Sequence, residues 1–182
     1  MRASHLSTFL EIATRAYADH DRLKDELTAE RSQIDPKFWG HFMQQDELDH
    51  IYTQVIVFLA MYMEAYIWDT GATYLGEKTM ERLDKLSPQD KWEVVPQLLL
   101  NAPFPIKAHQ QGYLKSLFQE RNRLVHHKSI DMRPYIGKQI AVKGIPKDLI
   151  DFWERIDLGH YFEIVRVLPK SLEAGIRNKY SH

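Results

Sequence analysis

Two arginines and two histidines lie close together in residues 118–129, FQERNRLVHHKS. Histidine titrates near neutral pH and is the usual side chain for moving protons, whereas arginine carries a fixed positive charge that stabilises anions. The adjacent His126 and His127 lack the i, i+4 spacing of a helical zinc site, and the chain has no cysteine. This segment therefore favours proton transfer beside a stabilised anion, and we expect no metal and no cofactor.

The segment belongs to a helix that we expect at about residues 110–129. The apolar residues that form one stripe along this helix are Leu114, Leu117, Phe118, Leu124 and Val125. Arg121 falls inside that stripe, and a buried unpaired charge is very costly, so Arg121 needs a partner, a cleft or a subunit interface. Asn122 and His126 are four residues apart and lie together on a neighbouring face.

Simpler structural explanations apply to the same residues. Arg121 can form an ion pair with Glu64 or with another acidic residue. His127 and Lys128 can complement the negative end of the helix dipole. These explanations stay open beside the functional one.

The formal net charge of -1 hides an asymmetry along the chain. Residues 1–106 contain 10 Lys and Arg against 17 Asp and Glu, a net of -7. Residues 107–147 contain 9 against 2, a net of +7, and residues 148–182 contain 5 against 6. A basic segment either packs beside an acidic one in the folded protein or forms a cationic surface for a phosphate-bearing partner.

The periodicity of apolar residues is helical nearly throughout and predicts one all-α domain over residues 1–182. We expect an antiparallel bundle of about five main helices. The first ends before Pro36, and the second runs from about Asp46 to Tyr74, after the loop FWGHF. Two short helices follow, the second capped by Ser87. A loop or small hairpin occupies residues 130–146, and a last helix over about residues 147–178 is interrupted near Gly159 and Pro169.

The apolar run at residues 51–68 is the most hydrophobic part of the chain. It contains Gln54 and Glu64 and has acidic residues on both sides, so we interpret it as a buried central helix rather than a membrane span. The first residues have no long apolar core of a signal peptide. Together with the lack of cysteine, these features predict a cytoplasmic protein without a membrane partner.

The run Arg121-Asn122-Arg123-Leu124-Val125-His126 resembles the Arg-x4–6-His motif of HEPN domains (higher eukaryotes and prokaryotes nucleotide-binding). In that motif Asn, Asp or His commonly follows the arginine directly. HEPN domains are all-α bundles whose motif lies late in an apolar-striped penultimate helix. The resemblance covers residues 44–129 well. His127 also fits the looser spacing, and we take His126 as the motif histidine.

The resemblance implies a metal-independent endoribonuclease that acts as a homodimer, with both motifs lining one shared cleft. His126 would transfer protons, Arg121 would stabilise charge on phosphorus, and Asn122 would orient the imidazole or hold a phosphate oxygen. His127 is a possible supporting residue. Lys115, Arg123 and Lys128 would contact the RNA backbone.

The second helix of HEPN domains often carries a polar residue that faces the motif, for which Glu64 is the candidate and Asp69 the second choice. Some family members are non-catalytic modules for nucleic-acid or nucleotide binding or for dimerisation. The resemblance therefore also allows such a module as an alternative. A third alternative is a purely structural helical adaptor, in which the match to the motif would be a coincidence. A toxin or defence role would bring an antitoxin as partner, and nucleotidyltransferases are partners of other members.

Overall fold

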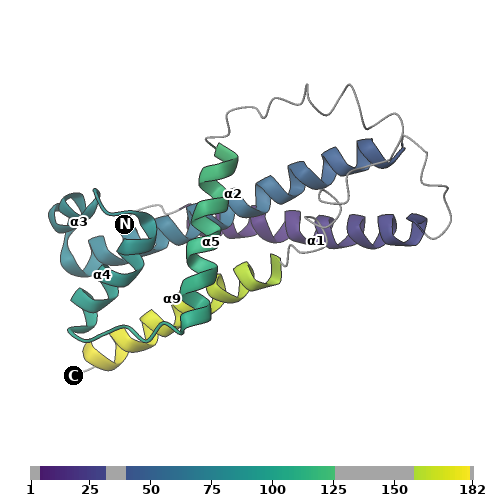
Figure 1. Cartoon of the computed structure of the whole chain (residues 1–182). Coiled ribbons are helices and arrows are strands. Elements are labelled where there is room, and N and C mark those ends of the chain that lie inside the picture. Colours follow the sequence, from purple (N-terminus) through teal and green to yellow (C-terminus); the bar gives the residue numbers. More distant parts are fainter. Residues whose placement is uncertain (1–4, 32–39, 126–157, 181–182) are drawn as a thin grey trace.

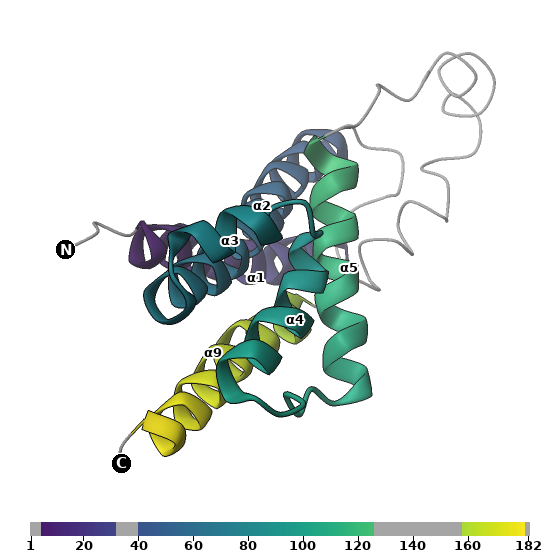
Figure 2. The same ribbon diagram turned by 90° about the vertical axis from the view of Figure 1, so that its left-hand side faces the viewer.

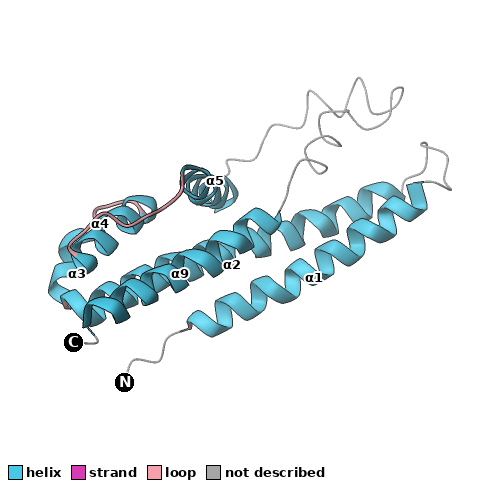
Figure 3. Cartoon of the chain, turned by 90° about the horizontal axis from the view of Figure 1, so that it is seen from below, coloured by secondary structure: helices cyan, strands magenta, loops and turns pink. Residues whose placement is uncertain are grey.

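A computed structural model describes residues 5–31, 40–125 and 158–180 of the chain. These parts form six helices and no strand. Figure 1 labels the helices, and Figure 3 colours them by secondary structure. The helices are α1 (Leu6–Arg31), α2 (Gly40–Leu75), α3 (Glu77–Leu83), α4 (Pro88–Leu100), α5 (Ala108–Val125) and α9 (Leu158–Tyr180). The predicted all-α bundle is confirmed.

The long helices α1 and α2 lie side by side and run in opposite directions (Figure 1). On α1 the buried residues Ala13, Ala16 and Leu23 recur at intervals that place them on one helical face. This face packs on α2, and most of the exposed residues of α1 are polar or charged. The predicted antiparallel packing is therefore present in this pair.

Helix α2 is the central element, because α1, α3, α4, α5 and α9 all pack against it. Its side chains Ile56, Leu59, Met63 and Ile67 are fully buried. The segment Glu47–Leu75 is also long and apolar enough to cross a membrane, a test that core helices of soluble proteins pass as well. Its contacts with five other helices are consistent with a core helix.

Local signals define the turns on either side of α3 and α4. Gly76 has a φ of 86°, which only glycine adopts readily, and it separates α2 from α3. Ser87 caps α4 by accepting the backbone N–H of Asp90 at 3.1 Å, with Pro88 at the first helical position. Asn101 then ends α4 in the left-handed conformation, with a φ of 55°.

Helix α5 crosses the long helices instead of running along them. Figure 3 shows α5 nearly end-on while α1, α2 and α9 extend lengthwise, and Figure 2 gives a second view of the crossing. Helix α9 packs against α2, α4 and α5 and runs in the same general direction as α2. All six helices contribute to one hydrophobic core.

Three expected boundaries differ from the structure or lie outside its described part. Helix α2 begins at Gly40 rather than near Asp46, so part of FWGHF is helical. Helix α9 continues through Pro169, where an interruption was expected. Pro169 is buried in α9, and its carbonyl accepts a hydrogen bond from the Tyr66 hydroxyl of α2 at 3.2 Å, so packing on α2 holds the helix at this point although proline has no N–H donor. The predicted loop or hairpin at residues 130–146 lies outside the described residues.

Candidate active site on the motif helix

Helix α5 is anchored on α2 by three buried side chains. Leu114, Leu117 and Phe118 are at most 4% exposed and join the common core. The predicted apolar stripe is therefore correct over this half of the helix. At its end the stripe fails, because Val125 is 55% exposed. Arg121 lies between these regions, at the edge of the α2–α5 contact.

Arg121 forms an ion pair with Glu64 of α2, as one structural explanation predicted. The distance from its Nη2 to Oε2 of Glu64 is 2.8 Å. The Arg121 side chain is 24% exposed and that of Glu64 is 34% exposed. The pair is therefore partly solvated, and water can reach the guanidinium that the motif provides.

Asn122 holds the second terminal nitrogen of Arg121. Its Oδ1 accepts a hydrogen bond from Nη1 of Arg121 at 2.9 Å. A guanidinium has five N–H donors, and the two contacts with Asn122 and Glu64 use one N–H on each terminal nitrogen. Three donors are not used in these contacts, which is enough for a planar, bidentate contact with a phosphate.

Arg123, the second motif arginine, is bound to an acidic residue. Its Nε and Nη2 lie 2.9 Å and 2.8 Å from the same carboxylate oxygen of Glu120. The hydroxyl of Tyr52 also donates to that oxygen at 3.2 Å. The charge of Arg123 is therefore balanced by Glu120, which reduces its value as an RNA contact.

The Tyr52 side chain links α2 to this second polar cluster. Burial raises the pKa of Tyr52 well above its usual range, and the negative charge of Glu120 adds to the effect. For Arg123, burial is the largest single effect and lowers the pKa, but the hydrogen bonds and charge interactions with Glu120 and Tyr52 together outweigh it and raise the pKa. Tyr52 therefore stays protonated and Arg123 charged at physiological pH.

Two interhelical polar contacts thus flank the buried contact between α5 and α2. Arg121 reaches α2 at Glu64, and its sequence neighbour Glu120 reaches α2 at Tyr52, twelve residues earlier. A rotation of α5 about its own axis would break both contacts. The two contacts therefore fix which face of α5 presents Arg121.

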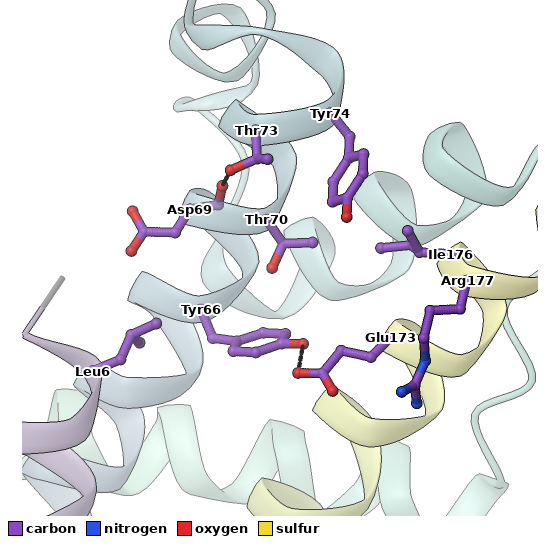
Figure 4. A pocket seen from close by; sticks show the side chains of 9 residues that line it. All are labelled: Leu6, Tyr66, Asp69, Thr70, Thr73, Tyr74, Glu173, Ile176 and Arg177. Carbon is purple, nitrogen blue, oxygen red and sulfur yellow. Dashed lines mark hydrogen bonds between the residues drawn. The ribbon is translucent and has the colours of Figure 1, made fainter. Parts of the chain in front are cut away.

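The remaining predicted site residues do not all lie beside Arg121. Lys115 is exposed on α5 and is available for a phosphate contact. Asp69 lines a separate cleft formed with α1 and α9, which Figure 4 shows, and makes no ion pair with Arg121. Of the two acidic candidates, Glu64 is the one that the structure brings to Arg121. His126, His127 and Lys128 lie outside the described residues.

The sequence interpretation did not identify Glu120 and Tyr52. A local signal existed for the first of them, because Glu120 and Arg123 have the i, i+3 spacing of a helical ion pair. No local signal identifies Tyr52, which lies 68 positions away from Glu120 inside an apolar run. A contact between residues so far apart in the sequence is identified only from the tertiary structure.

No group of three histidine or acidic side chains in the described part of the chain has an arrangement that could hold a metal ion. No family model matches the chain, and neither a curated protein nor a solved structure matches it significantly.

Proposed function

We propose that the chain is a metal-independent endoribonuclease of the HEPN type that cleaves RNA at a composite site in a homodimer. One observation carries the proposal: Glu64 and Asn122 hold the motif arginine, Arg121, at a partly exposed position. An arginine held in this way provides a fixed positive charge where negative charge develops on phosphorus.

The chemistry requires a proton acceptor and a charge stabiliser. His126 takes the proton from the ribose 2′-hydroxyl, whose oxygen attacks the adjacent phosphorus. Arg121 stabilises the phosphorane, and the bond to the 5′ oxygen breaks as that oxygen gains a proton. The products are a 2′,3′-cyclic phosphate and a 5′-hydroxyl. RNA supplies its own nucleophile in this reaction, so no serine, cysteine or metal is required.

A dimer completes the site because Arg121 and His126 are five residues apart on the motif helix. On an ideal helix this spacing separates them by about 140° around the axis, and one helix does not easily bring both to one phosphate. A two-fold axis beside α5 would place Arg121 of one protomer opposite His126 of its partner. The exposed Val125 on α5 supports an interface at this position.

A cleavage assay with paired substrates tests the proposal. The purified chain should cut single-stranded RNA and leave DNA of the same sequence intact. The rate of RNA cleavage should be the same with and without a metal chelator. His126→Ala should lower the rate by roughly 10²–10⁴, the range for removal of a general acid or base. His127→Ala is the matched control and should have a milder effect. Intact RNA after incubation with wild-type protein would contradict the proposal.

The alternative is a non-catalytic HEPN module for binding nucleic acids or nucleotides, or for dimerisation. The Arg121–Glu64 ion pair supports it too, because Arg121 already has a partner without any substrate. The module would bind RNA without cutting it, and its alanine variants would differ from wild type in affinity. A filter-binding measurement beside the cleavage assay separates the two functions. A toxin or defence role in the cytoplasm, with an antitoxin or nucleotidyltransferase partner, is part of the enzyme proposal.

A further inference from the structure

A groove runs between α1 and α9, and α2 lies along its floor. Two adjoining hollows form it, of about 520 Å³ and about 500 Å³. Glu173 of α9 lines both of them, so they meet at this residue. The hydroxyl of Tyr66 donates to the Glu173 carboxylate at 3.0 Å, a contact that Figure 4 shows at the centre of the first hollow.

One face of α2 forms the floor of the groove. Tyr62, Tyr66, Thr70 and Tyr74 recur every four residues and therefore lie in one row along the helix. Aromatic side chains of this kind are enriched in the contact surfaces between proteins, because they offer apolar area together with a polar tip.

Matching faces of α1 and α9 form the two walls. Leu6 of α1 and Ile176 of α9 line the first hollow. Leu10 and Phe162 line the second hollow. Tyr17 of α1 stacks on Phe162, with ring centroids 4.7 Å apart, and both rings line the second hollow. The walls therefore carry apolar side chains on both sides, and all of these except the buried Ile176 are partly exposed.

The shape of the groove fits one more helix. Three helices that leave a lengthwise groove can accept a fourth, as in four-helix bundles and in helix-in-groove complexes. The wall of α9 extends from Phe162 to Arg177, which is about 22 Å at 1.5 Å per residue. A helix of about 15 residues spans this length.

The charges on the rim determine the kind of helix. Arg166 and Lys170 are exposed, line the second hollow and are four residues apart on α9. The first hollow adds one acidic residue, Asp69, and one basic residue, Arg177, and Glu173 between the two hollows is bound by Tyr66. On the opposite wall Thr14 is uncharged. Carboxylates spaced i, i+4 on an entering helix would face the two cations of α9.

We propose that this groove binds an amphipathic helix of a partner protein, with an apolar face on the α2 tyrosines and carboxylates toward Arg166 and Lys170. The proposal is independent of RNA cleavage, because α5 and Arg121 do not line the groove. A second copy of the chain is disfavoured on a two-fold axis through the groove, because two concave surfaces would face each other and leave both unfilled.

Selection from a library of displayed 15-residue helical peptides tests this proposal with the full chain as bait. The enriched peptides should carry an apolar stripe and two carboxylates four residues apart. Binding of the best synthetic peptide, followed by fluorescence anisotropy, should weaken about 10-fold or more for the double variant Arg166→Glu/Lys170→Glu. Exchange of the peptide's two carboxylates for lysines should restore binding to that variant.

A matched control has the same change in charge on another surface. Arg82→Glu/Lys85→Glu alters two exposed cations at the end of α3 and should bind the peptide as wild type does. Circular dichroism verifies that both double variants are folded. The proposal is wrong if no peptide is enriched over scrambled sequences, or if both double variants bind equally. The proposal is also wrong if residues 126–157 of the same chain cross-link to the groove and the added peptide does not reduce this cross-linking.

Discussion

Arg121 and Glu64, 57 positions apart in the chain, form the ion pair that connects the motif helix to the central helix. The pair lies beside the buried contact of α5 with α2 and is still reached by solvent. The pair can therefore affect both the free energy of unfolding and the proposed RNA cleavage, and the two effects can be measured separately.

Arg121→Ala should change activity far more than stability. Solvent-exposed ion pairs contribute about 0–1 kcal/mol, and both side chains of this pair are partly exposed. The free energy of unfolding, measured with urea, should therefore fall by less than about 1 kcal/mol. If Arg121 stabilises the transition state, RNA cleavage should fall by about 10²–10³.

Glu64→Gln is the informative companion to this variant. It removes the negative charge, retains a hydrogen-bond acceptor for Arg121 and should leave stability within the same range. A loss of about 3 kcal/mol or more for Arg121→Ala, with wild-type activity in the protein that remains folded, would show that the pair is structural.

The chain should sediment as a dimer at micromolar concentration, and Val125→Asp should shift it toward the monomer. Val125 is an exposed apolar side chain on the helix proposed to form the interface, and a charge there would have to be desolvated. Leu98→Asp on α4 is the matched control, since Leu98 is 50% exposed outside that surface. A monomeric wild type, or equal effects of both variants, contradicts the shared site.

The free energy of unfolding should decrease above about pH 10, and Tyr52 and Tyr66 should cause much of the decrease. Burial raises the pKa of both hydroxyls, with the charge of Glu120 adding to it at Tyr52 and the bond to Glu173 at Tyr66. Tyrosine in the unfolded chain loses its proton near pH 10, whereas these two keep theirs in the folded state. Their stabilisation is therefore complete below about pH 10 and is lost as the pH rises further.

The slope of this decrease is at most about 1.4 kcal/mol per pH unit for each tyrosine. Urea titrations between pH 8 and pH 11 measure it, and Tyr52→Phe and Tyr66→Phe should each flatten the curve. Tyr180→Phe, at a residue that is 53% exposed, serves as control. Identical slopes for all three variants would refute the assignment.

Gly71→Ala should destabilise the protein by about 1–3 kcal/mol, the usual cost of overpacking a core. A Cβ at this position would overlap the sulfur of Met80 and lie 3.1 Å from Cγ1 of Val95, and both side chains are fully buried. Gly112→Ala on α5 meets nothing within 4 Å and should instead stabilise by about 0.5–1 kcal/mol. Thermal unfolding of the two variants, with opposite shifts in Tm, checks this pair.

Local chemistry explains what could be predicted from the sequence. The Ser87 side chain caps the helix that it was expected to begin, and the second helix ends within one residue of the expected Tyr74. The buried half of the stripe on α5 follows from helical periodicity alone. Glu64 was identified as a partner of Arg121 because an arginine in an apolar stripe needs a counter-charge.

The remaining features depend on how the helices pack. Sequence periodicity shows which face of a helix is buried, but it does not distinguish an antiparallel neighbour from a crossing helix such as α5. Pro169 indicates a break locally, yet α9 continues through it, with the proline buried and its carbonyl bonded to the Tyr66 hydroxyl of α2. Asp69, the second choice for the residue that faces the motif, lines the groove between α1 and α9, a position that depends on how these helices pack.

The hydrogen bond between Tyr66 and Glu173 has a consequence for the order of folding. It joins residues 107 positions apart, whereas α1 and α2 are neighbours in the chain and close a short loop. Closing the longer loop costs more chain entropy, so we expect the α1–α2 hairpin to form first and α9 to dock late. The groove would then exist only once α9 is seated, and a folding intermediate without α9 would expose the row of tyrosines on α2 to solvent.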